Sequence, residues 1–160
     1  MKFSMQAAEV FIPDGSAEDS ALARTTHLGI GAHHDDLEIM AIEGILCGYE
    51  DADSWFTGVV VTDGGGSPRV GKFADHSDEA MKSVRRDEQK KAASLGKYGV
   101  QIMLAHASAT VKNSAETVVA EELRSILEAT CPDVVYTHNP ADKHDTHIAV
   151  MLRVLEAIRM

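Results

Sequence analysis

The 160-residue chain is 44% hydrophobic and 25% charged, a balance typical of a globular domain and unlike that of a disordered polypeptide. Its formal net charge of −10 argues against nucleic acid or an anionic membrane as a partner, because either would need a basic surface that displaces counterions. No apolar run approaches the roughly 18 residues of a membrane helix, and the first residues lack the apolar core of a signal peptide.

The two cysteines, Cys47 and Cys131, lie far apart and form no CxxC pair. This spacing predicts neither a disulfide framework nor a thiolate zinc site, so each cysteine is expected to be a small buried side chain. Such cysteine usage fits a reducing compartment. We therefore expect a cytoplasmic protein.

Apolar strands alternate with amphipathic helices along the chain. In order, the pattern predicts an extended segment (8–13), a short helix capped by Ser16 (16–24), a strand (26–32), a helix (37–49), a strand (55–62), a glycine-rich loop (63–78), a helix (79–95), a strand (100–104), a helix (114–129), a strand (133–137) and a last helix (148–160). This alternation predicts an α/β fold, a Rossmann-like parallel sheet with helices on both faces. We expect one domain over 1–160, in which 1–25 form an N-terminal extension.

Two histidines and two aspartates, residues 33–36, separate the first core strand from the helix that follows it. Turns of this kind, at the carboxyl ends of strands, are where α/β proteins place their sites. Burying these groups without partners would cost on the order of several kcal/mol each, so we expect a positive group against them. A divalent metal is the natural candidate, with His33 and Asp36 as ligands and Asp35 acting on a bound water. A turn that uses one aspartate only as a helix cap is the alternative, and it leaves His33 unexplained.

A second polar cluster follows the last strand, over residues 138–147. Because parallel strands end at one edge of a sheet, His147 can meet the first cluster as a third metal ligand. Two imidazoles and a carboxylate suit zinc with an open position for water, although cobalt, manganese or iron also fit. His144 lies one helical turn earlier and can donate a hydrogen bond or a proton to a tetrahedral intermediate. The residues expected to orient these imidazoles are Asp142, Asp145 and His138.

Both clusters carry a family resemblance. Residues 32–38 (AHHDDLE) resemble the AHPDDxE motif of the PIG-L/LmbE family of zinc-dependent de-N-acetylases, with His34 in place of proline. Residues 142–147 (DKHDTH) resemble the DxHPDH motif of the same family, and Arg85 opens a segment similar to its R-x-x-E helix. By this likeness zinc is held by His33, Asp36 and His147, while Asp35 is the general base, His144 assists the intermediate and Arg85 contacts the substrate.

The chain also departs from the family pattern. Asp145 and Thr146 stand where the second motif has proline and aspartate, so the orienting aspartate is shifted or absent. Residues 106–110 replace a D-G turn of the family, which predicts a different sugar specificity. The likeness runs from about residue 26 to 159 and lacks the usual C-terminal part, so we expect the catalytic core of that domain.

These features favour a zinc hydrolase that removes the acetyl group of an N-acetylated amino sugar or sugar conjugate, a small-molecule substrate. A nucleotide- or dinucleotide-binding domain is one alternative, since Gly29 and Gly31 begin a GxGxxG-like segment, but His34 replaces its third glycine. A catalytically silent, metal-binding subunit is another. Arg85 and Glu88 could equally form an ion pair on a solvated helix face.

Two further expectations concern surfaces. Apolar residues recur on the last helix, and we expect a second subunit or a further layer to cover them. They are Met151, Leu152, Leu155 and Ile158. The histidines outside the two clusters, His27, His76 and His106, are expected to be ordinary surface or strand-edge residues.

Overall fold

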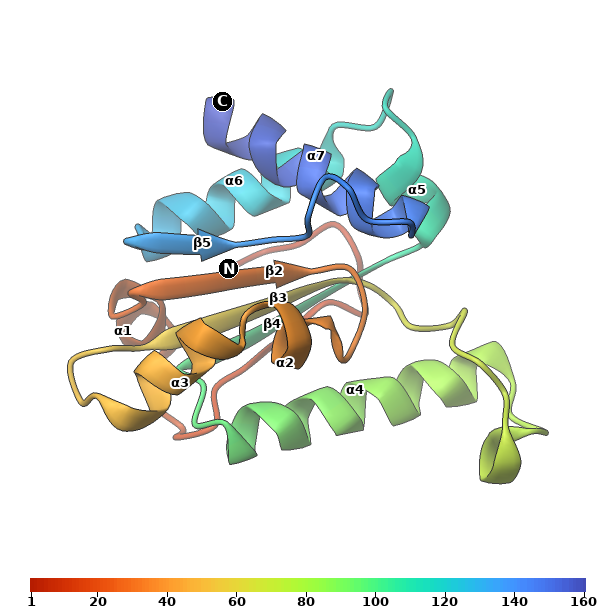
Figure 1. Ribbon diagram of the computed structural model, residues 1–160, viewed down its shortest axis with the longest axis horizontal. Helices are drawn as coiled ribbons and strands as arrows, with labels where there is room; N and C mark the ends of the chain where they lie inside the picture. Colours follow the sequence, from red (N-terminus) through yellow and green to blue (C-terminus); the bar gives the residue numbers. More distant parts are fainter.

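Five strands form one mixed sheet in the computed structural model, which describes residues 1–160 (Figure 1). The strands are β1 (Glu9–Phe11), β2 (His27–Gly31), β3 (Phe56–Thr62), β4 (Val100–His106) and β5 (Val134–Tyr136), in the order β1-β4-β3-β2-β5. The predicted α/β fold is confirmed. The pairs β2–β3, β2–β5 and β3–β4 are all parallel. The prediction of an all-parallel sheet is wrong for one strand. The N-terminal extended segment forms β1, which pairs antiparallel with β4 at the edge of the sheet.

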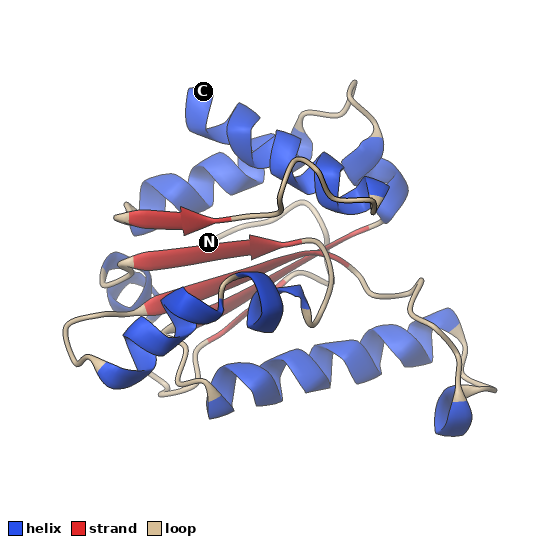
Figure 2. Cartoon of the chain, viewed as in Figure 1, coloured by secondary structure: helices blue, strands red, loops and turns tan.

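The helices lie on both faces of this sheet (Figure 2). They are α1 (Glu18–Ala23), α2 (Asp36–Met40), α3 (Ile42–Glu50), α4 (Asp78–Leu95), α5 (Ser108–Lys112), α6 (Val118–Thr130) and α7 (Asp145–Arg159), with a 3-10 turn, η1 (Gly71–Phe73). The single helix expected over 37–49 is broken at Ala41, whose φ and ψ of −115° and 20° are not helical. The cap of α1 is Ala17 rather than Ser16. None of these helices is long and apolar enough to cross a membrane.

Successive side chains of the central strands pack into two separate hydrophobic cores. Val59 and Val61 of β3 pack in a cluster with side chains of α1, α6 and α7, whereas Val60 packs with side chains of α2, α3 and α4. Because side chains alternate across a strand, this division means that both faces of the sheet are covered. Because both faces are covered, β3 and β4 have near-continuous apolar sequences.

The outer face of α7 is only partly covered. Met151 is buried, while the side chains of Leu152, Leu155 and Ile158 are exposed by 56%, 41% and 56%. The expected second subunit or further layer on this face stays a prediction. The cysteines were predicted wrongly as buried residues, since Cys47 is half-buried and Cys131 is exposed. Cys131 ends α6 in the left-handed conformation with φ of 42°, which places it at the surface.

His106, which was expected to be an ordinary surface or strand-edge residue, is buried at the end of β4. Its Nε2 lies 2.7 Å from Oε2 of the buried Glu122 on α6, and the backbone N–H of Ser4 donates to Oε1 of Glu122 at 2.6 Å. The polar partner explains how a histidine at the end of a core strand is accommodated, because a buried polar group is tolerated when it is hydrogen-bonded. Two elements and the N-terminal segment thus meet at one carboxylate.

Acid is expected to weaken the fold partly through Glu122. Burial raises the pKa of this carboxyl, but hydrogen bonds from His106 and Ser4 outweigh burial and hold its pKa below the ordinary value. Such a group stabilises the fold above its unfolded pKa of about 4.3, and this contribution is lost as the pH falls through the lower folded pKa. In urea titrations between roughly pH 5 and pH 3, Glu122→Gln should lose less stability than the wild type. Parallel pH profiles for the two proteins would contradict this assignment.

Candidate metal centre

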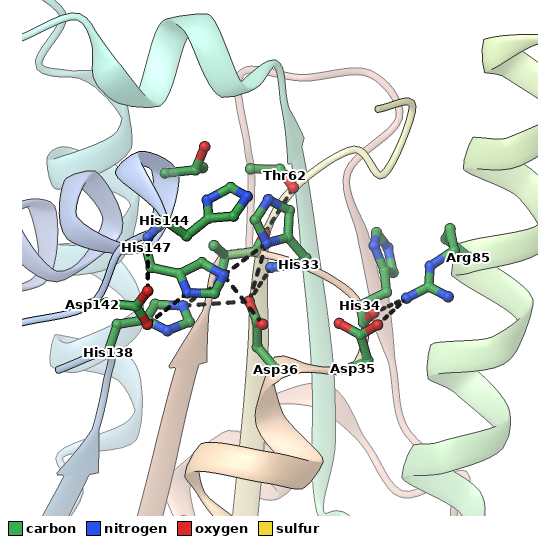
Figure 3. Close-up of polar contacts among 12 residues, drawn as sticks. His33, His34, Asp35, Asp36, Thr62, Arg85, His138, Asp142, His144 and His147 are labelled. Atoms are coloured by element: carbon green, nitrogen blue, oxygen red, sulfur yellow. Dashed lines mark hydrogen bonds and ion pairs between the residues drawn. The ribbon is translucent and has the colours of Figure 1, made fainter. Parts of the chain in front are cut away.

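The two polar clusters meet at the carboxyl ends of the neighbouring strands β2 and β5 (Figure 3). His33 and Asp36 lie in the turn between β2 and α2 and at the start of α2. His138 follows β5, and His147 projects from the first turn of α7, which begins three residues earlier than the sequence pattern predicts. The pairing of β2 with β5 is what brings positions more than 100 residues apart into contact.

Three donor groups face one another closely enough to share an ion. Nδ1 of His33 lies 3.1 Å from Nε2 of His147. Oδ2 of Asp36 lies 3.4 Å from Nδ1 of His33, and Oδ1 of Asp36 lies 3.4 Å from Nε2 of His147. Zinc with nitrogen and oxygen ligands at about 2.0–2.1 Å in a tetrahedron separates its ligand atoms by about 3.3–3.4 Å. Each of these three contacts has the separation of neighbouring zinc ligands, with the two histidines on different oxygens of one carboxylate, and the two imidazoles and the carboxylate are groups that suit zinc.

Two sets of three donor atoms lie within 4.8 Å of one another, and each contains two members of this trio. One contains His138 with Asp36 and His147. The backbone N–H of Ala32 donates to Nε2 of His138 at 2.8 Å, so the lone pair of that nitrogen is already engaged. The other contains His144, whose side chain is 52% exposed. The predicted ligands His33, Asp36 and His147 are thus divided between the two sets, which share His147.

The imidazole rings around the trio are stacked on one another. His138 lies parallel to His147 with ring centroids 4.0 Å apart, and the ring of His144 also stacks on His147, at 4.5 Å. Oδ2 of Asp142 lies 2.9 Å from Nδ1 of His147, which directs Nε2 of that ring toward Asp36. Asp145 instead pairs with Lys112 at 2.9 Å and lies 3.8 Å from His144. Of the two aspartates expected to orient the imidazoles, Asp142 is therefore the one that contacts the His147 ring.

The electrostatics of the cluster favour a cation. Burial raises the pKa of the Asp36 carboxyl, but its polar contacts with His138 and His33, including a 2.6 Å hydrogen bond from the backbone N–H of His33, outweigh burial and hold the pKa well below its usual range. Burial and the neighbouring imidazoles of His147 and His33 lower the pKa of His144. At neutral pH the carboxylate is consequently ionised and His144 is uncharged.

One carboxylate oxygen of Asp35 faces Arg85 on α4 (Figure 3), and Asp35 lines the same cavity as the donor trio. Its Oδ2 lies 2.7 Å from Nη2 of Arg85, and the same nitrogen donates to the carbonyl oxygen of His34. Asp35 precedes α2 with φ of 116°, a conformation that is rare and strained for a residue with a Cβ atom. Arg85 also pairs with Glu88 at 2.9 Å, as the ion-pair alternative for this residue expected.

His34 is a buried residue that the sequence did not distinguish from its charged neighbours. Its side chain is packed under Gly64, and its Nδ1 is buried without a hydrogen-bond partner. Burial, followed by the positive charge of Arg85, lowers the pKa of His34 to about 4. The ring is therefore neutral at pH 7. The only sequence feature that could have distinguished His34 was that it replaces the proline of the family motif.

A cavity of about 580 Å³ lies over the trio, and none of its 16 lining residues is hydrophobic. It includes the predicted catalytic pair Asp35 and His144, together with Arg85. It also includes Ser108, from the 106–110 segment expected to affect sugar specificity, and a residue that the sequence did not suggest, Lys112 of α5. For Lys112 the available signal was its position soon after a core strand, because α5 itself was not expected. The lining suits a highly polar small molecule.

The contact between Asp142 and His147 leads to a measurable expectation. Asp142→Asn weakens the charge-assisted hydrogen bond that orients the ring, so we expect zinc affinity to fall by about 10- to 100-fold in competition with a zinc-binding dye. Asp145→Asn is the matched control, since Asp145 faces Lys112, and its zinc affinity should stay at the wild-type value. Equal losses in both variants would show that the Asp142 contact has no special role.

Solved structures with related folds support this description of the chain. N,N'-diacetylchitobiose deacetylase from Pyrococcus horikoshii matches with a TM-score of 0.71 and 20% identity over 92% of this chain and 54% of its own. GalB, the 4-carboxy-2-hydroxymuconate hydratase from Pseudomonas putida KT2440, matches with a TM-score of 0.69 and 18% identity over 83% of this chain and 55% of its own. A conserved protein from Thermus thermophilus has a TM-score of 0.64 and 18% identity, over 84% of this chain and 56% of its own.

These similarities concern the fold, and the chain spans about half the length of each of the three proteins. No protein with a curated description matches the chain in sequence. The family model described as GlcNAc-PI de-N-acetylase matches residues 28–158, which include both polar clusters and Arg85. The chain therefore belongs to the PIG-L family.

Proposed function

We propose that the protein is a metal-dependent N-deacetylase that removes the acetyl group from an N-acetylated amino sugar or sugar conjugate. The observation that carries the proposal is the meeting of His33, Asp36 and His147, with contacts of 3.1–3.4 Å, beside a cavity that no hydrophobic residue lines. Membership of the PIG-L family supports the same reaction class. The proposed metal is zinc.

In this proposal each residue of the cavity has a role in hydrolysis of the amide. Zinc, when bound by the trio, would polarise the carbonyl of the acetyl group and lower the pKa of a water molecule to about 7. Asp35 accepts a proton from the attacking water and returns it to the nitrogen of the departing amine, while the uncharged His144 donates a hydrogen bond to the oxygen that becomes negative. Asp142 keeps the ring of His147 in its orientation. Acetate and a free amine are the products.

The lining of the cavity supports a sugar as the substrate. Hydroxyl and amide groups of a sugar need hydrogen-bond partners, and the cavity offers side chains such as Ser67, Ser108 and Lys112. A nucleotide-binding domain has less support, because Asp35, Asp36 and Asp63 all line the same cavity and repel phosphate groups. The Pyrococcus neighbour is described as a deacetylase of N,N'-diacetylchitobiose, which makes that disaccharide a sensible first substrate.

The proposal is tested by measuring both products. The zinc-loaded protein is incubated with N-acetylglucosamine, N,N'-diacetylchitobiose and N-acetylglucosaminyl-inositol, and acetate and primary amine are quantified together. We expect equal amounts of the two from at least one substrate, loss of both after a chelator, and recovery after zinc is added back. Zinc-loaded protein that releases neither product would instead favour the catalytically silent subunit.

A further inference from the structure

We infer that Arg85 is a positioning residue for Asp35, the proposed general base, rather than primarily a contact for the substrate. This inference rests on the proposed function. It starts from the ion pair between Nη2 of Arg85 and Oδ2 of Asp35, which joins α4 to the turn before α2 across 50 residues of sequence. Figure 3 shows the carboxylate directed at the guanidinium.

The guanidinium is itself held from several directions. Nη2 donates to Asp35 and to the carbonyl of His34, and Nη1 donates to Glu88 at 2.9 Å. Its side chain is 21% exposed, and the backbone at Gly64 passes so close that a Cβ there would lie 3.1 Å from Cβ of Arg85. Because Arg85 lies on the long helix α4 and makes these contacts, its guanidinium has a well-defined position.

Asp35, by contrast, has little else to orient it. Its side chain is 65% exposed, and it makes no capping hydrogen bond to α2 although it occupies the cap position. Arg85 provides the hydrogen bond that its carboxylate makes. A general base must lie within hydrogen-bond reach of the proton it accepts, so a carboxylate that rotates freely in solvent would spend little time in a productive orientation.

The hydrogen bonds of Arg85 also leave little for a substrate. Of the five N–H groups of a guanidinium, three are engaged by Asp35, His34 and Glu88. Nε is buried without a partner and does not reach the cavity surface. One N–H of Nη1 remains. A residue whose main purpose is to bind a sugar would be expected to keep more of its donors free.

The experiment is a double-mutant cycle on the zinc-loaded enzyme, with Arg85→Gln, Asp35→Asn and the combined variant. We expect Arg85→Gln to lower kcat by about 10- to 100-fold with little change in KM, because a misplaced reacting group costs up to about 100-fold. In the Asp35→Asn background the same change should cost nothing further. Arg85→Lys should recover part of kcat. Arg86→Gln is the matched control, since Arg86 contacts Glu9 and Ala7 away from the cavity.

A second readout uses metal-free protein and no assay. In crystals of metal-free Arg85→Gln, the Asp35 carboxylate should leave its wild-type position and turn to solvent or to the free N–H groups at the start of α2, while zinc content after loading stays at the wild-type value. An unmoved carboxylate would overturn the inference. So would a raised KM with unchanged kcat and additive losses in the double variant, which are the signs of a substrate contact. A wild type without deacetylase activity would refute the proposed function alone, since the crystal readout would still decide the positioning role.

Discussion

Replacing His147 by alanine is expected to abolish zinc binding and, with it, deacetylation. The substitution removes one of three donor groups that contact one another at 3.1–3.4 Å, and the two that remain both come from the single turn between β2 and α2. A catalytic zinc site ordinarily keeps three protein ligands. Elemental analysis of purified, zinc-loaded protein should give about one zinc per chain for the wild type. The variant should hold almost none.

His76→Ala is the control for this measurement, because His76 lies in the loop before α4, against Phe73 and outside the cavity. It should keep the wild-type zinc content. Asp36→Ala should behave like His147→Ala, since both remove a member of the same trio. If zinc stayed bound in both of these variants, the ion would lie elsewhere and the proposed centre would be wrong.

Asp35→Asn is expected to have the second-largest effect, a fall in kcat of about 10²- to 10⁴-fold, the usual contribution of a general base. Asparagine has nearly the same shape and can still accept a hydrogen bond from Arg85, but it cannot accept a proton at neutral pH. Zinc content should remain that of the wild type, because Asp35 belongs to none of the sets of donor atoms that could hold the ion. A variant that kept kcat within a few-fold of the wild type would transfer the role of base to another group.

The parts of the fold that follow from local pattern were predictable. The strands β2 to β5 stand out as apolar runs between helical segments, and the polar residues after β2 and β5 mark the carboxyl edge of the sheet, where the structure indeed brings them together. Periodicity depends only on neighbouring residues, so it survives without tertiary information. It also gave the correct general position of α4 and α6.

Features that depend on distant partners were not predictable in this way. His106 looks like a surface residue until Glu122 is placed beside it, and nothing in the sequence says which of Asp142 and Asp145 turns toward His147. The break at Ala41 and the helix α5 are short-range irregularities without a Gly or Pro to announce them. The pairing of Arg85 with Asp35 joins two elements through the tertiary fold, and spacing along α4 only suggested the pair with Glu88.

The proposed centre joins His33, in the turn after β2, to His147, 114 positions later at the start of α7. A bound ion would therefore affect the stability of the protein as well as its chemistry. An ion that binds only when both ends are in place acts as a removable cross-link between the first core strand and the last helix. Each tenfold excess of free metal over its dissociation constant then adds about 1.4 kcal/mol to the free energy of unfolding. Metal scarcity would therefore shorten the survival of the protein against proteolysis, in addition to lowering its activity.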